Sequence, residues 1–242
     1  MNLVIDVGNT LVKLAVFESG TLKHKKPCIK TDFLATLAEF FDHFPTITDC
    51  IVSSVSNLSE HQLSKLRQYC KILLLDHETP VPFINKYSTP QTLGIDRIAL
   101  VSAAAYQYVA RNVLIIDAGT CITYDFLSED NEYLGGAISA GISLRYKSLH
   151  TFTDKLPLLE ANIPKEFIGS STATSIHSGI LNGVLYEIDG FIDAYKENYE
   201  NLTVILTGGD AHFLRETIKN DIFANSNFLL EGLNHILEYN KH

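Results

Sequence analysis

Two short motifs in the sequence combine aspartate, glycine and a hydroxyl or amide residue directly after an apolar run. The first is Asp6-Val7-Gly8-Asn9-Thr10, and the second is Asp117-Ala118-Gly119-Thr120. Glycine lets a backbone approach a ligand closely, and the N–H groups of such a turn can bind phosphate oxygens. The aspartates can hold a cation or its waters beside those phosphates, which suits Mg²⁺. One such motif alone is typical of an ordinary hairpin turn, but two copies at corresponding points favour phosphate binding.

Three charged residues near these motifs could take part in a transfer reaction. Lys13 follows Thr10 on an apolar run and is either a solvated strand residue or a point charge that reaches a phosphate. Asp96 and Arg97 directly precede an apolar, helix-like segment. Asp96 either caps that helix or accepts a proton from an attacking hydroxyl while Arg97 binds a substrate oxygen. Orientation matters more than basicity in phosphoryl transfer, so an ionised aspartate can serve as the base.

Two further segments give weaker signals, and several well-known motifs are missing. Thr207-Gly208-Gly209-Asp210 follows a predicted strand and precedes a predicted helix, where N–H groups can face an anion. Ser170-Ser171-Thr172 is typical of a helix N-terminus, whose hydroxyls cap N–H groups or bind a polar ligand. The sequence has no P-loop, no Gly-x-Gly-x-x-Gly turn, no Gly-x-Ser-x-Gly elbow and no zinc-ligand spacing.

The spacing of apolar residues predicts the elements that carry these motifs. The chain opens with a strand, the polar Asp6–Thr10 turn and a second strand, which together form a hairpin. An irregular, proline-containing connection is predicted over residues 77–92. The other predicted strands are residues 50–55, 72–75, 114–117, 122–127 and 202–206, and the predicted helices are 32–43, 60–69, 98–108, 175–195 and two more after residue 210.

The opening of the chain recurs 111 residues later, where Leu114-Ile115-Ile116-Asp117 repeats the pattern of Leu3-Val4-Ile5-Asp6. Each copy is followed by another apolar run and then by a glycine turn. This recurrence predicts the duplication of one unit, with a boundary near Asn112. We therefore expect an N-terminal domain over residues 1–112 and a C-terminal domain over residues 113–242.

Composition limits the class of protein. The chain has 242 residues, 46 % of them hydrophobic, and 28 acidic against 19 basic residues give a net charge of −9. This balance predicts a folded, soluble protein and argues against nucleic-acid binding, which needs a basic face. The longest apolar run is too short to span a membrane. Four dispersed cysteines and an N-terminus unlike a signal peptide predict a cytoplasmic location.

Taken together and in order, these motifs resemble those of the type III pantothenate kinases, a branch of the actin-like phosphotransferase superfamily. The resemblance covers nearly the whole chain. Each motif is modestly specific, and the ordered set is highly specific. The matching segments are Asp6–Thr10 with Lys13, Pro90–Arg97, Asp117–Thr123, Gly135–Gly141, and Gly169–Thr172 with Ser178-Gly179.

The resemblance implies an α/β protein made of duplicated actin-like (ribonuclease H-like) domains, with a nucleotide cleft between them. It implies ATP, Mg²⁺ and a monovalent cation (K⁺ or NH₄⁺) as cofactors, pantothenate as substrate, and a homodimer whose partner completes the pantothenate pocket. Carried over by position, Asp96 is the base and Asp117 holds the monovalent cation. The residues that the resemblance assigns to ATP are Asp6, Gly8, Asn9, Thr10, Lys13, Gly119 and Thr120, and those that it assigns to pantothenate are Tyr87, Gly94, Ile95, Arg97 and Thr172. One departure is Ala140, where the family usually has proline, and we expect it to alter loop stiffness and not to abolish activity.

Without the resemblance, the residues predict nucleotide-dependent phosphoryl transfer but do not identify the acceptor. Three hypotheses follow. The first is a kinase that makes 4′-phosphopantothenate, the first step of coenzyme A biosynthesis. The second is a non-catalytic, actin-like nucleotide-binding regulatory protein, against which Asp96, Lys13 and Asp117 argue. The third is a related small-molecule kinase or phosphatase with a different pocket.

Overall fold

Long apolar segments of the sequence form two β-sheets in the computed structural model, which describes residues 1–8, 11–54, 58–164 and 166–241. The chain divides into two compact units: unit 1 comprises Met1–Val109 and Asn227–His242, and unit 2 comprises Ala110–Ser226. The division between the units lies close to the predicted boundary at Asn112. The C-terminal segment differs from the prediction, because it returns to unit 1.

Unit 1 is built on a sheet with the strand order β3-β2-β1-β4-β5. β1 pairs antiparallel with β2 and parallel with β4, and β4 pairs parallel with β5. The strands of this sheet are β1 (Asn2–Val7), β2 (Val12–Glu18), β3 (Thr21–Cys28), β4 (Asp49–Ser54) and β5 (Lys71–Leu74). The short strand β6 (Ile84–Asn85) lies in the same segment of the chain but is not part of this sheet. The helices are η1 (Lys30–Asp32), α1 (Phe33–His43), α2 (Glu60–Arg67), η2 (Pro90–Thr92), α3 (Ile95–Gln107) and α7 (Phe228–Tyr239).

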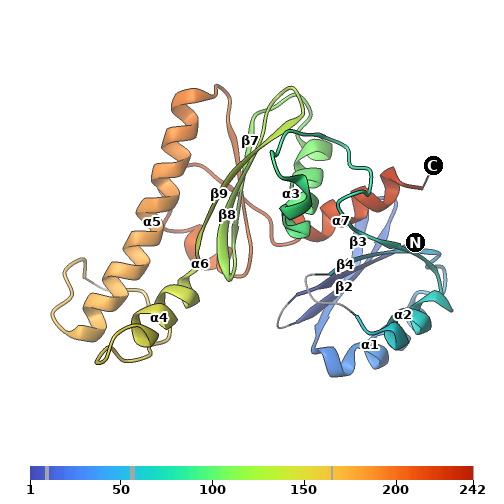
Figure 1. Ribbon diagram of the computed structural model, residues 1–242, viewed down its shortest axis with the longest axis horizontal. Helices are drawn as coiled ribbons and strands as arrows, with labels where there is room; N and C mark the ends of the chain where they lie inside the picture. Colours follow the sequence, from blue (N-terminus) through green and yellow to red (C-terminus); the bar gives the residue numbers. More distant parts are fainter. Residues whose placement is uncertain (9–10, 55–57, 165, 242) are drawn as a thin grey trace. The chain divides into compact units, whose positions relative to one another are not determined.

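The two faces of the unit 1 sheet are covered by different helices (Figure 1). Leu3, Ile5 and Val7 of β1 belong to the core beneath α1 and α2. Side chains alternate along a strand, so Asn2 and Asp6 lie on the other face. There Asn2 donates to Asn234 of α7 over 2.7 Å, and α7 packs against α3, β1 and β4. Asp6 is therefore on the sheet face that carries α3 and α7.

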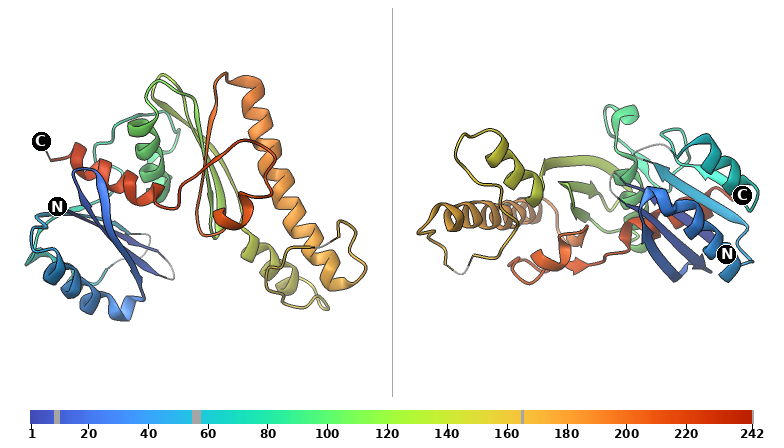
Figure 2. Two further views of the ribbon diagram at one scale, coloured as in Figure 1. Left: turned by 180° about the vertical axis from the view of Figure 1, so that it is seen from behind. Right: turned by 90° about the horizontal axis from the view of Figure 1, so that it is seen from below.

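Unit 2 repeats this architecture with the strand order β11-β10-β7-β8-β9. β7 pairs antiparallel with β8 and parallel with β10, as β1 does with β2 and β4. The long helix α5 runs along one face of this sheet (Figure 2) and shares a core with β7, β8 and β10. The elements are β7 (Val113–Ala118), β8 (Cys121–Leu127), β9 (Glu132–Ala140), α4 (Ile142–Thr151), α5 (Thr172–Asn198), β10 (Thr203–Thr207), α6 (Ala211–Leu214) and β11 (Phe223–Ala224).

The shared strand order confirms the duplication that the recurring motif predicts. In unit 2 the core side of β7 carries Leu114, Ile116 and Ala118, so Asp117 lies on the opposite face, as Asp6 does in unit 1. In the described part of the chain, no helix is long and apolar enough to cross a membrane.

Candidate active site

The first Asp-x-Gly turn, at the end of β1, contains a buried carboxylate with a lysine opposite. Asp6 pairs in register with Lys13 on β2, and Lys13 Nζ lies 3.4 Å from Asp6 Oδ2. The Lys13 side chain is 51 % exposed and that of Asp6 only 9 %. Lys13 is thus neither purely solvated nor buried: it contacts Asp6 and keeps half of its surface free for another anion. Asn9 and Thr10 lie outside the described residues.

Burial raises the pKa of Asp6, and the Asp96 carboxylate raises it further, while Lys13 lowers it. Burial is the largest of these causes, so the pKa of Asp6 is raised mainly because its carboxylate is removed from water. Asp96 belongs to the same unit and its charge reaches Asp6. Unit 1 therefore brings Asp6, Lys13 and Asp96 into one electrostatic cluster. Gly8 closes the described part of the turn through an N–H that donates to the Leu11 carbonyl over 3.0 Å.

Asp96 lies inside the first turn of α3 and does not cap it. The helix begins at Ile95 with Gly94 as its N-cap, three residues before the predicted start, so the capping alternative is wrong. The Asp96 Oδ1 atom accepts the Arg97 backbone N–H over 2.9 Å. A Cβ at Gly94 would lie 2.4 Å from that oxygen, so glycine leaves the space that the carboxylate occupies. The helix start also places positive backbone potential beside Asp96.

Arg97 and Tyr87 meet beside this carboxylate. Arg97 is only 4 % exposed, and its guanidinium carbon lies 5.5 Å from the centre of the Tyr87 ring. A cation over an aromatic face is held in place without losing its charge. The predicted substrate-contacting residues of unit 1 therefore lie together at the start of α3, with Ile95 as its first residue.

The second Asp-x-Gly turn, in unit 2, has a threonine where the first has lysine. Asp117 on β7 pairs in register with Thr123 on β8 and with Thr207 on β10. The Thr123 hydroxyl is buried, and no hydrogen-bond partner for it occurs among the described residues. Gly208 has φ +98°, and a Cβ there would lie 2.4 Å from Asp117 Oδ1. This glycine therefore keeps space open next to the carboxylate.

The backbone of the second turn packs against the start of α4. The Gly119 N–H donates to the Cys121 carbonyl and the Gly141 N–H donates to the Thr120 carbonyl, each over 3.0 Å. A Cβ at Gly141 would lie 2.2 Å from the Gly119 oxygen and 2.5 Å from the Thr120 oxygen. Only glycine fits there, so the backbone of the turn at Gly119-Thr120 is in direct contact with the backbone of Gly141.

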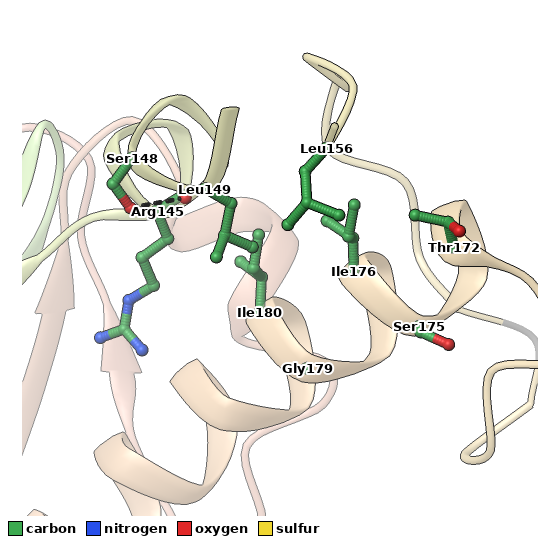
Figure 3. A pocket seen from close by; sticks show the side chains of 9 residues that line it. All are labelled: Arg145, Ser148, Leu149, Leu156, Thr172, Ser175, Ile176, Gly179 and Ile180. Atoms are coloured by element: carbon green, nitrogen blue, oxygen red, sulfur yellow. Dashed lines mark hydrogen bonds between the residues drawn. The ribbon is translucent and has the colours of Figure 1, made fainter. Parts of the chain in front are cut away.

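Thr172 is the first residue of α5 and lies at one end of an open pocket of about 760 Å³ (Figure 3). Ser171 caps the helix, and its hydroxyl accepts the Thr174 N–H, which confirms the predicted helix N-terminus. Arg145 of α4 lies at the other end of the pocket. The apolar residues between them are Leu149, Leu156, Ile176 and Ile180.

The sequence did not single out Arg145 and Glu187. Arg145 NH2 lies 2.5 Å from Glu187 Oε2 of α5, and 42 positions separate the two residues. Two isolated charged residues on different helices form no sequence motif, so only the fold shows that they are in contact. No group of three or more metal-ligating His, Cys, Asp or Glu side chains is found within the described ranges.

The chain is similar to known proteins over nearly its whole length. A family model described as type III pantothenate kinase matches residues 2–194. The type III pantothenate kinase of Christiangramia forsetii is 52 % identical over 241 residues, which cover 100 % of this chain and 99 % of the relative. That of Flavobacterium johnsoniae is 48 % identical over 239 residues, with 99 % and 98 % covered.

Solved structures show the fold. A putative Baf family transcriptional activator from Campylobacter jejuni is 23 % identical with a TM-score of 0.63, and 98 % of each chain is covered. A putative N-acetylmannosamine kinase from Listeria monocytogenes is 13 % identical with a TM-score of 0.55, and 98 % of this chain and 99 % of that one are covered. With the repeated strand order, these likenesses confirm the predicted α/β class of duplicated actin-like domains.

Proposed function

We propose that Asp96 is the general base of the phosphoryl transfer that this chain catalyses. The chain belongs to the type III pantothenate kinase family and is thus an ATP-dependent kinase of pantothenate in coenzyme A biosynthesis. The acceptor hydroxyl oxygen attacks the γ-phosphorus, and the bond from that phosphorus to the β,γ-bridging oxygen breaks. ADP leaves with the bond electrons, and the hydroxyl proton moves to the Asp96 carboxylate.

The observation that carries this proposal is the placement of Asp96 at the start of α3. Its carboxylate is half-buried, oriented by the Arg97 N–H, and given room by Gly94. Phosphoryl transfer passes through a loose transition state, so a base acts mainly by aligning the hydroxyl. A carboxylate fixed at a helix start meets that requirement.

We assign pantothenate to the residues around Asp96. The Arg97 guanidinium, held over Tyr87, can bind a carboxylate or carbonyl oxygen of the substrate. Gly94 and Ile95 supply backbone beside it. Thr172, at the start of α5, is assigned to pantothenate by the family resemblance alone.

We assign the ATP phosphates to the two Asp-x-Gly turns. In the first turn, Lys13 offers an ammonium that is half exposed and can contact a phosphate oxygen as a point charge. In the second turn, the Thr120 hydroxyl supplies a donor, and Gly119, which has no side chain, lets a phosphate approach the backbone closely. The Asp6 carboxylate, which lies close enough to Asp96 to feel its charge, can hold a magnesium ion arriving with ATP, whose charge offsets that of the carboxylates and phosphates. Gly8, Asn9 and Thr10 complete this assignment.

The surroundings of Asp117 fit a monovalent cation, K⁺ or NH₄⁺. The Thr123 hydroxyl is buried and lacks a partner among the described residues, and Gly208 keeps the space beside the carboxylate open. Oxygen atoms of a carboxylate and a hydroxyl are suitable ligands for such a cation. When bound, it would supply positive charge beside the phosphate turn.

The proposal is tested by ATP consumption with and without pantothenate in the wild type and in Asp96→Asn. We expect kcat to fall by about 10²–10⁴-fold, the usual effect of removing a general base, while titration calorimetry shows that ATP and pantothenate still bind. Asp42→Asn, an exposed aspartate of α1, is the control. Undiminished turnover in Asp96→Asn would refute the assignment of the base. A wild type that binds ATP without pantothenate-dependent turnover would favour the regulatory hypothesis.

We also propose that the protein is a cytoplasmic homodimer in which the partner completes the pantothenate pocket. Large apolar side chains are exposed in the connection between α4 and α5, among them Phe152 at 84 % and Ile168 at 80 %, and a second copy could cover them. The free cysteines suit a reducing compartment. Light scattering should give twice the chain mass, and Phe152→Glu with Ile168→Glu should give the monomer. A monomeric wild type would refute the dimer.

A further inference from the structure

Arg145 connects three elements of unit 2 outside the turns described above. Its Nε donates to the Ala140 carbonyl over 2.8 Å, and its NH2 donates to the Ser139 hydroxyl over 3.0 Å. The same NH2 contacts Glu187 of α5, so one side chain joins the end of β9, the first turn of α4 and the middle of α5. The Arg145 and Glu187 side chains are 21 % and 23 % exposed.

The other oxygen of Glu187 extends this contact set to β8. Tyr124, which is fully buried, donates its hydroxyl to Glu187 Oε1 over 3.1 Å. Glu187 thus accepts from Arg145 on one side and from Tyr124 on the other. A carboxylate bonded to partners on two elements is fixed in position, and it fixes both elements relative to α5.

The residues that Arg145 binds are those that support the second phosphate turn. Ala140 and Ser139 pair in register with Cys121 and Ile122, the residues that follow Thr120. The backbone of the next residue, Gly141, packs against the turn and donates a hydrogen bond to it. Any shift of the end of β9 would therefore move Gly119 and Thr120.

We propose that Arg145 is a positioning residue which, with Glu187, fixes the Gly119-Thr120 turn relative to α5. The inference depends on the proposed function, because it takes this turn as a binding site for the phosphates of ATP. Arg145 touches no substrate in this role. It acts through the β9 end and Gly141, and it holds the turn in register with the helix that carries Thr172 at its start (Figure 3).

The geometry of the guanidinium distinguishes this role from a simple ion pair. Arginine can bond a carbonyl, a hydroxyl and a carboxylate at once, whereas lysine is a compact point charge. Arg145→Lys keeps the charge beside Glu187 but cannot reproduce all three contacts. A purely electrostatic role would let lysine restore function, and a positioning role would not.

The test compares steady-state kinetics of Arg145→Lys, Arg145→Met and Glu187→Gln with those of the wild type. We expect the KM for ATP to rise about five- to twentyfold in each variant, while the KM for pantothenate stays within about twofold. Lys147→Met, which removes an exposed lysine from the same helix, is the matched control and should leave both constants unchanged. Glu187→Gln is nearly isosteric, so it keeps the test valid if the Arg145→Met protein is unstable.

Thr120→Ala separates failure of this inference from failure of the proposed function. If Thr120→Ala raises the KM for ATP and the Arg145 and Glu187 variants do not, the positioning role is wrong and the phosphate turn stands. If Thr120→Ala leaves the KM for ATP unchanged, the turn is not a phosphate site and the inference falls with it. Variants that lower only kcat, as a smaller folded fraction would, or a full rescue by lysine, also overturn it.

Discussion

The two Asp-x-Gly turns have the same place in two sheets of the same strand order, yet they differ in what stands opposite the aspartate. Lys13 pairs with Asp6, whereas Thr123 pairs with Asp117. The first turn therefore contains its own positive charge. The second has a hydroxyl at the equivalent position, so under the proposed function its positive charge would come from a bound cation. The two turns share their strand pairing and differ in this opposing side chain.

The turns also differ in how closely they are packed. In the first turn, a Cβ at Gly8 would lie 3.1 Å from the Leu11 carbonyl oxygen, which is a tight but tolerable contact. The second turn is enclosed by Gly141 and Gly208, where a Cβ would come within 2.2 Å and 2.3 Å of backbone oxygens. The second turn therefore depends on two glycines from other segments, Gly141 at the start of α4 and Gly208 after β10.

The largest effect is expected from neutralising each aspartate. Asp6→Asn and Asp117→Asn should each lower kcat by about 10²–10³-fold, because each removes a carboxylate that, under the proposed function, holds a cation near the transferred phosphoryl group. Only Asp117→Asn should also lose its stimulation by potassium over sodium. ATP consumption in the two buffers measures both effects, with Asp130→Asn, at an exposed turn, as the control. Equal potassium dependence in the two variants would contradict the division of roles.

The packing difference predicts a second, smaller contrast. Gly208→Ala places a Cβ at φ +98° and 2.3 Å from the Ala118 oxygen, and it should lower the free energy of unfolding by about 2–4 kcal/mol. Gly8→Ala should lower it by about 1 kcal/mol or less, since only one contact tightens. Urea denaturation followed by circular dichroism measures both. Similar losses for the two variants would show that the turns are equally packed.

Much of this comparison could be predicted from the sequence because it depends on local patterns. The apolar runs before Asp6 and Asp117 marked β1 and β7, and the spacing of apolar residues placed α1, α2 and α5 within a few residues of their observed ends. Helix α3 begins earlier than predicted because its first turn, with Asp96 and Arg97, is polar. Strand β3 escaped prediction because it is an exposed edge strand rich in lysine.

Contacts between distant segments could not be predicted. The Arg145–Glu187 pair joins two helices across 42 positions, and the support of the second turn by Gly141 depends on the register of β8 with β9. The C-terminal helix α7 is amphipathic, and its sequence does not show which sheet it covers. Its buried Asn234, which accepts from Asn2, fixes it to unit 1.

A third prediction concerns a variant in which the second turn receives the lysine that stands opposite the aspartate in the first. Thr123→Lys supplies an ammonium at the register position of Lys13, so the activity should lose its dependence on potassium, with kcat lower by about tenfold because the geometry is imperfect. Thr123→Val is the matched variant, since it removes the hydroxyl without adding charge; its activity should still require potassium, at a higher concentration than in the wild type because one proposed ligand is lost. ATP consumption across a potassium titration distinguishes them. A lysine variant that still requires potassium would mean that the opposing residue does not set the difference between the turns.

The smallest effect is a gain in stability from removing the buried charge of the first turn. Burial raises the folded-state pKa of Asp6 above its ordinary value of 3.8, so its ionised form is less favourable in the folded protein than in the unfolded chain. Its contribution to stability is full below pH 3.8 and is lost as the pH rises through the folded pKa. Asp6→Asn should therefore melt at a higher temperature than the wild type at pH 7, and the difference should shrink as the pH approaches 4.

Asp76 provides the control of opposite sign. Hydrogen bonds from the Thr79 side chain, and then from backbone N–H groups, lower its pKa, so the stability that it contributes is present above pH 3.8 and is lost in acid. Asp76→Asn should therefore melt at a lower temperature than the wild type at pH 7, with the difference again shrinking in acid. Melting curves from pH 4 to pH 8 test both signs. A destabilised Asp6→Asn at pH 7 would show that Lys13 outweighs burial, and the first turn would then be stabilised by its own ion pair.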